Sequence, residues 1–110
     1  MNILVCDDDK EIVEAVEVYL KNEGYNILKC YSGLQAIETV ENNEIHLIIM
    51  DIMMPGMDGI KTTTKIREIK NIPVIMLSAK SEETDIILGL NMGADDYITK
   101  PFNPLEVTAR

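Results

Sequence analysis

Residues 47–59 read LIIMDIMMPGMDG, and they carry the clearest signal of the fold class. It opens with an apolar run that does not alternate with polar residues, which is typical of a strand buried on both faces of a parallel sheet. The run ends at Asp51. Pro55 and Gly56 suit the second and third positions of a tight turn, and Asp58 is a good N-cap for a helix that begins near residue 59. The stretch therefore predicts one strand–turn–helix unit of a parallel sheet.

The same alternation extends outward from this stretch in both directions. The expected strands cover 2–6, 25–29, 46–51, 72–78 and 96–100, and the expected helices cover 10–23, 32–43, 59–70, 82–93 and a fifth that starts at Pro104. Three of these helices show an apolar stripe: Ile12, Val13, Val16 and Leu20, then Ala36, Ile37 and Val40, then Ile60, Thr63, Ile66 and Ile69. The pattern predicts one α/β domain over residues 1–110 with the flavodoxin-like (βα)5 fold, a five-stranded parallel sheet of order 2-1-3-4-5 with helices on both faces.

Composition limits the function classes. Of the 110 residues, 46% are hydrophobic, which suits one domain with one core. The formal net charge of −9 shows no basic face for nucleic acid and favours cation binding. No stretch resembles a signal peptide or a membrane span, so a cytoplasmic location without membrane association is expected. Cys6 and Cys30 are expected to be free thiols, with Cys6 in the core.

Polar side chains follow four of the expected strands. In open α/β sheets, ligands bind outside the carboxyl ends of the strands, so these side chains are expected to converge. They are Asp7, Asp8 and Asp9 after the first strand, Asp51 after the third, Ser78 after the fourth and Lys100 after the fifth.

The expected acidic group suits a hard cation. Asp7, Asp8 and Asp51 offer only oxygen ligands, which Mg²⁺ (or Mn²⁺) prefers, and a bound cation would remove their mutual repulsion. The cation and the Lys100 ammonium would stabilise phosphoryl oxygens, which makes Asp51 a candidate nucleophile that forms an aspartyl phosphate. Asp9 is interpreted instead as the cap of the first helix.

Four segments of the chain resemble the receiver domain of bacterial two-component response regulators. They are ILVCDDD (3–9), LIIMDIMMPGMDG (47–59), PVIMLSAK (73–80) and GADDYITKPF (93–102), and the last resembles the OmpR/PhoB-type subfamily. The resemblance implies a switch that accepts a phosphoryl group from a sensor histidine kinase and changes its surface to control output, in that subfamily transcription. The resemblance implies that the domain is not an enzyme, although it can catalyse its own phosphorylation from small phosphodonors and its own dephosphorylation.

The resemblance also implies roles for individual residues. Asp51 matches the phosphoacceptor, Asp8 the direct Mg²⁺ ligand and Asp7 its partner, while Met53 matches the position whose backbone carbonyl completes the metal site. The remaining matches concern the switch: Ser78 as the hydroxyl that binds the phosphoryl group, Tyr97 as the aromatic ring that turns inward, Lys100 as the phosphoryl-binding lysine, and Lys100-Pro101 as a cis peptide.

A dimer interface is expected on the fourth helix, fifth strand and fifth helix. In the subfamily this face is an apolar centre with acidic–basic pairs, and a two-fold axis would let Asp96 meet Arg110 of the other copy. This chain departs from the pattern at Ile86, where a basic residue is usual. We expect a monomer at rest and weak homodimerisation on phosphorylation. The candidate residues are Ile86, Leu88, Met92, Asp95, Asp96, Glu106 and Arg110.

Several alternatives stay open or are weighed against this interpretation. The subfamily predicts a winged-helix DNA-binding domain beyond residue 110, with the last helix cut short, whereas a free-standing receiver would act on protein partners. A metal-dependent aspartyl-phosphate phosphotransferase or phosphatase of the haloacid-dehalogenase type would need an Asp where Met53 stands. A nucleotide or flavin binder would need a glycine-rich or hydroxyl-rich loop where the three aspartates 7–9 stand. His46 is expected to lie at the surface. The run at 62–65 is expected to be partly exposed on a helix and not to be a phosphorylation site.

Overall fold

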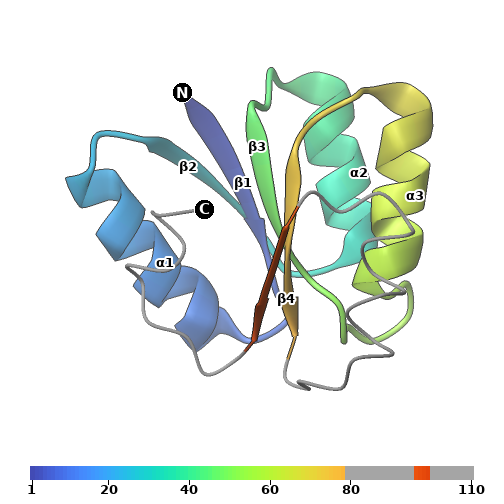
Figure 1. Cartoon of the computed structure of the whole chain (residues 1–110), viewed down its shortest axis with the longest axis horizontal. Coiled ribbons are helices and arrows are strands. Elements are labelled where there is room, and N and C mark those ends of the chain that lie inside the picture. The colour runs from blue at the N-terminus through green and yellow to red at the C-terminus, as the bar shows by residue number, and fades with distance from the viewer. Residues whose placement is uncertain (79–95, 100–110) are drawn as a thin grey trace.

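The computed structural model describes residues 1–78 and 96–99, and shows one parallel sheet with helices on both faces (Figure 1). The strand order is β2-β1-β3-β4-β5, as the sequence predicts. The expected helices at 82–93 and from Pro104 lie outside the described residues. The strands are β1 (Asn2–Cys6), β2 (Asn26–Cys30), β3 (Leu47–Asp51), β4 (Val74–Ser78) and β5 (Asp96–Thr99), and the described helices are α1 (Lys10–Asn22), α2 (Gly33–Asn42) and α3 (Gly59–Ile69).

The sheet separates two apolar layers. In Figure 1, α1 covers one face, and α2 and α3 cover the other. Because successive residues of a strand point to opposite faces, β1, β3 and β4 supply both layers, and their apolar runs need no polar alternation. The α1 layer contains Ile3, Val5, Val13, Val16, Leu20, Ile49, Ile75 and Leu77, and the other layer includes Leu4, Cys6, Ala36, Val40, Ile48, Met50, Ile66, Val74 and Met76.

The predicted helix caps are present. The Asp9 side chain accepts a hydrogen bond of 3.0 Å from the backbone N–H of Glu11, which confirms it as the cap of α1. Asp58 accepts one of 2.8 Å from the N–H of Lys61 at the start of α3. Gly56 has φ +76°, which the third position of the predicted turn requires and which glycine adopts without strain.

The third helix differs from the sequence prediction. Thr62 and Thr63 are fully buried. Thr63 belongs to the predicted stripe of this helix, whereas the expectation of a partly exposed surface at 62–65 is wrong for Thr62. Thr62 can be buried because its hydroxyl donates to the Asp58 carbonyl at 2.8 Å. Ile69, expected in the apolar stripe, is the last residue of α3 and 45% exposed, and Ile72 joins the core instead. Three other stripe residues are only partly buried at the edges of the two layers: Ile12, Ile37 and Ile60.

His46 lies at the surface, as predicted. Its side chain is 41% exposed, and its Nδ1 accepts a hydrogen bond of 2.9 Å from the Asn2 N–H. It comes just before β3, whereas Asp51 ends that strand, so His46 is at the opposite end of the sheet. Among the described residues, no helix has the length and apolar character needed to cross a membrane.

Candidate metal and phosphoryl site

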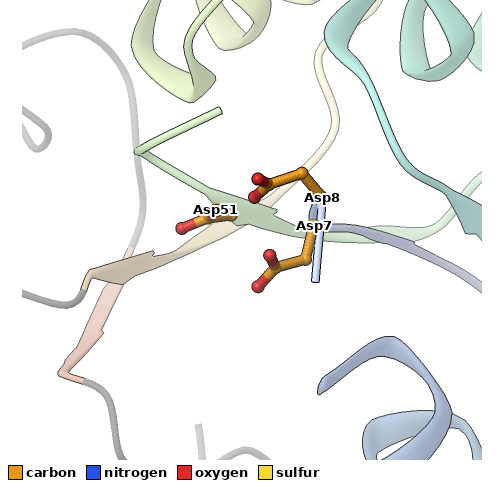
Figure 2. Close-up of side chains that lie close together, drawn as sticks. All are labelled: Asp7, Asp8 and Asp51. Atoms are coloured by element: carbon orange, nitrogen blue, oxygen red, sulfur yellow. The ribbon is translucent and has the colours of Figure 1, made fainter. Parts of the chain in front are cut away.

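Three aspartates meet where β1 and β3 end. Asp7 and Asp8 follow β1 directly, and Asp51 is the last residue of β3, the neighbouring strand. Each contributes a carboxylate oxygen, and these oxygens all lie within 4.8 Å of one another. Figure 2 shows the three side chains gathered at the strand ends. We call Asp7, Asp8 and Asp51 the acidic cluster.

The members of the acidic cluster differ in exposure. Asp7 is fully buried and Asp51 is 2% exposed, whereas Asp8 lies open to solvent. The backbone N–H of Asp7 donates to the Cys30 carbonyl at 3.2 Å, and its Oδ1 accepts from the Asp9 N–H at 2.9 Å. The cluster is therefore held from the sheet side and open on the Asp8 side.

The end of β3 is held by its neighbours as well. Asp51 pairs in register with Leu77, and the next residue, Ile52, donates its N–H to the Leu77 carbonyl at 3.0 Å. The Ile52 carbonyl in turn accepts from the N–H of Gly59 at 2.8 Å. Asp51 thus lies between the edge of β4 and the first turn of α3.

The donor set of the acidic cluster fits a hard divalent cation. Ligands on opposite sides of an octahedral Mg²⁺ are about 4.2 Å apart, close to the spread of these oxygens. Buried carboxylates in such proximity repel each other and lose hydration, which a cation would offset. Within the part of the chain that the structure describes, no soft ligand joins the three oxygens: the Met54 thioether is buried and contacts the Cys6 thiol at 3.6 Å in the core.

Both cysteines are free thiols and Cys6 is buried, as predicted, and Cys30 is buried as well. Burial raises the pKa of Cys6 far above its usual range, and the nearby Cys30 and the three carboxylates of the acidic cluster raise it further. Burial likewise raises the pKa of Cys30, although a hydrogen bond with Thr39 partly opposes this. Both thiols are therefore neutral at physiological pH and act as core residues.

The strands that carry the switch candidates end at the same edge. Ser78 ends β4 and pairs in register with Thr99, the last residue of β5, and Tyr97 pairs with Met76. For Ser78, Tyr97 and Asp96 the structure describes the backbone alone. The other candidates lie outside the described residues: Ile86, Leu88, Met92, Asp95, Lys100, Pro101, Glu106 and Arg110.

Gly59 is a site residue that the sequence reasoning missed. The sequence places it only at the start of a helix, whereas in the structure it lies against the backbone of Asp51. A glycine that directly follows a helix cap was the available signal, because glycine is otherwise unfavourable inside a helix.

Met53, expected to offer its backbone carbonyl to the metal, has a side chain that is 56% exposed.

Known proteins that are similar to this chain are response regulators or regulatory proteins. The response regulator receiver domain family matches residues 3–110. The regulatory protein VanR of Enterococcus faecium is 52% identical over 108 residues, which are 98% of this chain and 47% of VanR. The transcriptional regulatory protein YvrH of Bacillus subtilis (strain 168) is 48% identical over 110 residues, which are 99% of this chain and 46% of YvrH.

The chain thus spans about half the length of these relatives. Among solved structures, the complex of CheX, CheY, BeF3 and Mg²⁺ from Borrelia burgdorferi contains a similar chain. It has a TM-score of 0.93 and 33% identity, and the match covers 99% of this chain and 84% of that one. With the fold, the position of the acidic cluster and the matched length in agreement, the chain belongs to the response regulator receiver domain family.

Proposed function

We propose that Asp51 accepts a phosphoryl group and that the chain passes on this modification as a changed surface. The observation that carries the proposal is the acidic cluster: Asp51 is almost fully buried at the end of β3, with the carboxylates of Asp7 and Asp8 beside it. A single aspartate after a strand would be unremarkable. Three that converge from two strands form a site for a cation and for phosphoryl oxygens.

The chemistry requires one bond exchange. A carboxylate oxygen of Asp51 attacks the phosphorus of the donor, either a phosphohistidine of a sensor histidine kinase or a small acyl phosphate. A new O–P bond forms, the donor's P–N or P–O bond breaks, and the electron pair leaves with the imidazole or the carboxylate.

The cluster residues and the cation have separate tasks in this step. Asp7 and Asp8, with Asp51 and the Met53 backbone carbonyl, would hold Mg²⁺ (or Mn²⁺), which when bound neutralises charge on the carboxylates and the phosphoryl oxygens. Asp7 is kept in place by the Asp9 N–H, and exposed Asp8 leaves the site accessible from solvent.

The switch residues complete the proposal. The Ser78 hydroxyl and the Lys100 ammonium would bind the phosphoryl oxygens, and Tyr97 would turn inward as Ser78 moves, with the Lys100-Pro101 peptide in the cis form. Register supports this arrangement, because the ends of β4 and β5 lie level at the edge that carries Asp51. Phosphorylation would act by favouring one of two packings.

The proposed output is transcription, in the cytoplasm. The chain spans about half of its relatives, one of which is named a transcriptional regulatory protein, so DNA would be bound by a further domain and not by this acidic one. Homodimerisation on phosphorylation would link the modification of Asp51 to DNA binding by that further domain. A free-standing receiver that acts on protein partners is the alternative.

Labelling with acetyl phosphate and Mg²⁺, followed by mapping of the modified residue, tests the assignment. We expect one phosphoryl group per chain, on Asp51, and none on Asp51→Asn. Asp9→Asn is the matched control, because it makes the same change two residues from Asp7 at a position where Asn also caps a helix. Labelling of Asp51→Asn at the level of the unsubstituted protein would falsify the proposal.

A further inference from the structure

We propose that Gly59 is a positioning residue for Asp51. Because Gly59 has no side chain, the first turn of α3 can lie directly against the Asp51 carbonyl group, and this contact sets the place of the residue that carries the carboxylate. The inference rests on the proposed role of Asp51 as phosphoacceptor and adds a residue that acts through it.

The contact leaves no room for a larger residue. A Cβ atom at position 59 would lie 2.7 Å from the Asp51 carbonyl carbon and 2.9 Å from the Ile52 Cα, and closer still to the Asp51 carbonyl oxygen. Carbon atoms in good contact are about 3.5–4.0 Å apart. The crowded atoms belong to the backbone of the strand end and cannot rotate away as a side chain could. A side chain here must push α3 and the end of β3 apart.

Several hydrogen bonds hold the first turn of α3 in this place. The Gly59 N–H donates to the Ile52 carbonyl at 2.8 Å. Asp58 caps the helix through the Lys61 N–H at 2.8 Å, and its own carbonyl accepts from the Thr62 hydroxyl at 2.8 Å. The turn is therefore a rigid support, and a change at Gly59 is transmitted to Asp51 and Ile52 instead of being absorbed by the helix.

Small displacements of Asp51 have large consequences in a site of this kind. Its carboxylate must stay within reach of Asp7 and Asp8, whose oxygens lie within 4.8 Å of it. A misplacement of about 1 Å can cost about 100-fold in rate when reacting groups must be aligned.

Gly33 provides a matched control. It is the buried first residue of α2, as Gly59 is of α3. A Cβ atom there would collide with the Thr62 hydroxyl and lie 3.2 Å from the Met57 Cβ, with no atom of Asp51 among its nearest neighbours. Gly33→Ala therefore makes the same substitution under a similar steric load. Its closest clash is with the Thr62 side chain, which can shift, and the Met57 carbonyl oxygen at 3.2 Å is only a tight contact.

The experiment compares Gly59→Ala, Gly33→Ala and Asp51→Asn in the full chain, at a temperature at which circular dichroism shows the variants folded. Acetyl phosphate labelling and Mg²⁺ affinity are measured. We expect Gly59→Ala to lower the labelling rate at least about tenfold and to weaken Mg²⁺ binding. Gly33→Ala should cause a clearly smaller loss in both, because its clash reaches the first turn of α3 only through the Thr62 side chain and not through the backbone of Asp51. Unchanged labelling and Mg²⁺ affinity in Gly59→Ala, or equal losses in the two glycine variants, would overturn the inference.

A measurement on the unsubstituted protein covers the case in which Gly59→Ala does not fold. Mg²⁺ should slow hydrogen exchange of the Gly59 amide, which is bonded to Ile52, and leave the Ala36 amide, bonded to the Ser32 carbonyl in α2, unchanged. Equal behaviour of the two amides contradicts the inference. If the proposed function itself is wrong, the Asp51→Asn variant is still labelled by acetyl phosphate, and this result is distinct from any outcome of the glycine variants.

Discussion

At the scale of single residues, the acidic cluster combines two buried carboxylates with an exposed one. Asp8 is the exposed member, so its removal should relieve repulsion on Asp7 and Asp51 without opening a cavity. We predict that Asp8→Ala lowers Mg²⁺ affinity by about tenfold or more and, without Mg²⁺, raises the midpoint of thermal unfolding. Calorimetric titration and thermal unfolding in a chelator measure the two effects. As a control, Glu14→Ala, which removes an exposed carboxylate from α1, should leave both the Mg²⁺ affinity and the unfolding midpoint unchanged. If Asp8→Ala also leaves both unchanged, the acidic cluster is not the metal site.

At the scale of elements, α3 carries two buried threonines with different partners. The Thr62 hydroxyl donates to the Asp58 carbonyl, whereas within the described part of the chain the buried Thr63 hydroxyl has no hydrogen-bond partner. Valine has nearly the same shape as threonine and no hydroxyl to desolvate. We predict that Thr63→Val raises the free energy of unfolding by about 1 kcal/mol and that Thr62→Val lowers it by about 1 kcal/mol. Urea unfolding of both variants measures this, and a loss of stability in Thr63→Val would show that its hydroxyl is bonded after all.

At the scale of the whole molecule, charge opposes the expected dimer. Each chain carries a formal net charge of −9, so two copies repel each other at long range unless salt screens them. We predict a monomer at rest and weak dimerisation after treatment with beryllofluoride and Mg²⁺, because the contacts at the interface must overcome this repulsion. Sedimentation velocity measures it, with Asp51→Asn as the control that should stay monomeric. An identical profile in both states, unaffected by Ile86→Asp and Arg110→Glu, would place the output surface elsewhere.

The sequence alone predicts the order of the elements, the parallel sheet and the meeting of Asp7, Asp8 and Asp51 at one edge, because periodicity, caps and strand ends are local signals. It also located the caps Asp9 and Asp58, whose side chains bond to backbone two or three residues away. Which residues are buried, and which backbone segments approach each other closely, depends on how the elements pack and does not follow from local signals.

Two examples show why these features required the tertiary structure. Thr62 is buried because Gly33 of α2 lies over it, and Ile69 is exposed although it belongs to the same apolar stripe as buried Ile66. Gly59 lies against Asp51 because the first turn of α3 packs on the end of β3. Each of these depends on which neighbouring element covers a residue, and that is set by contacts between segments that are distant in the sequence or separated by a loop.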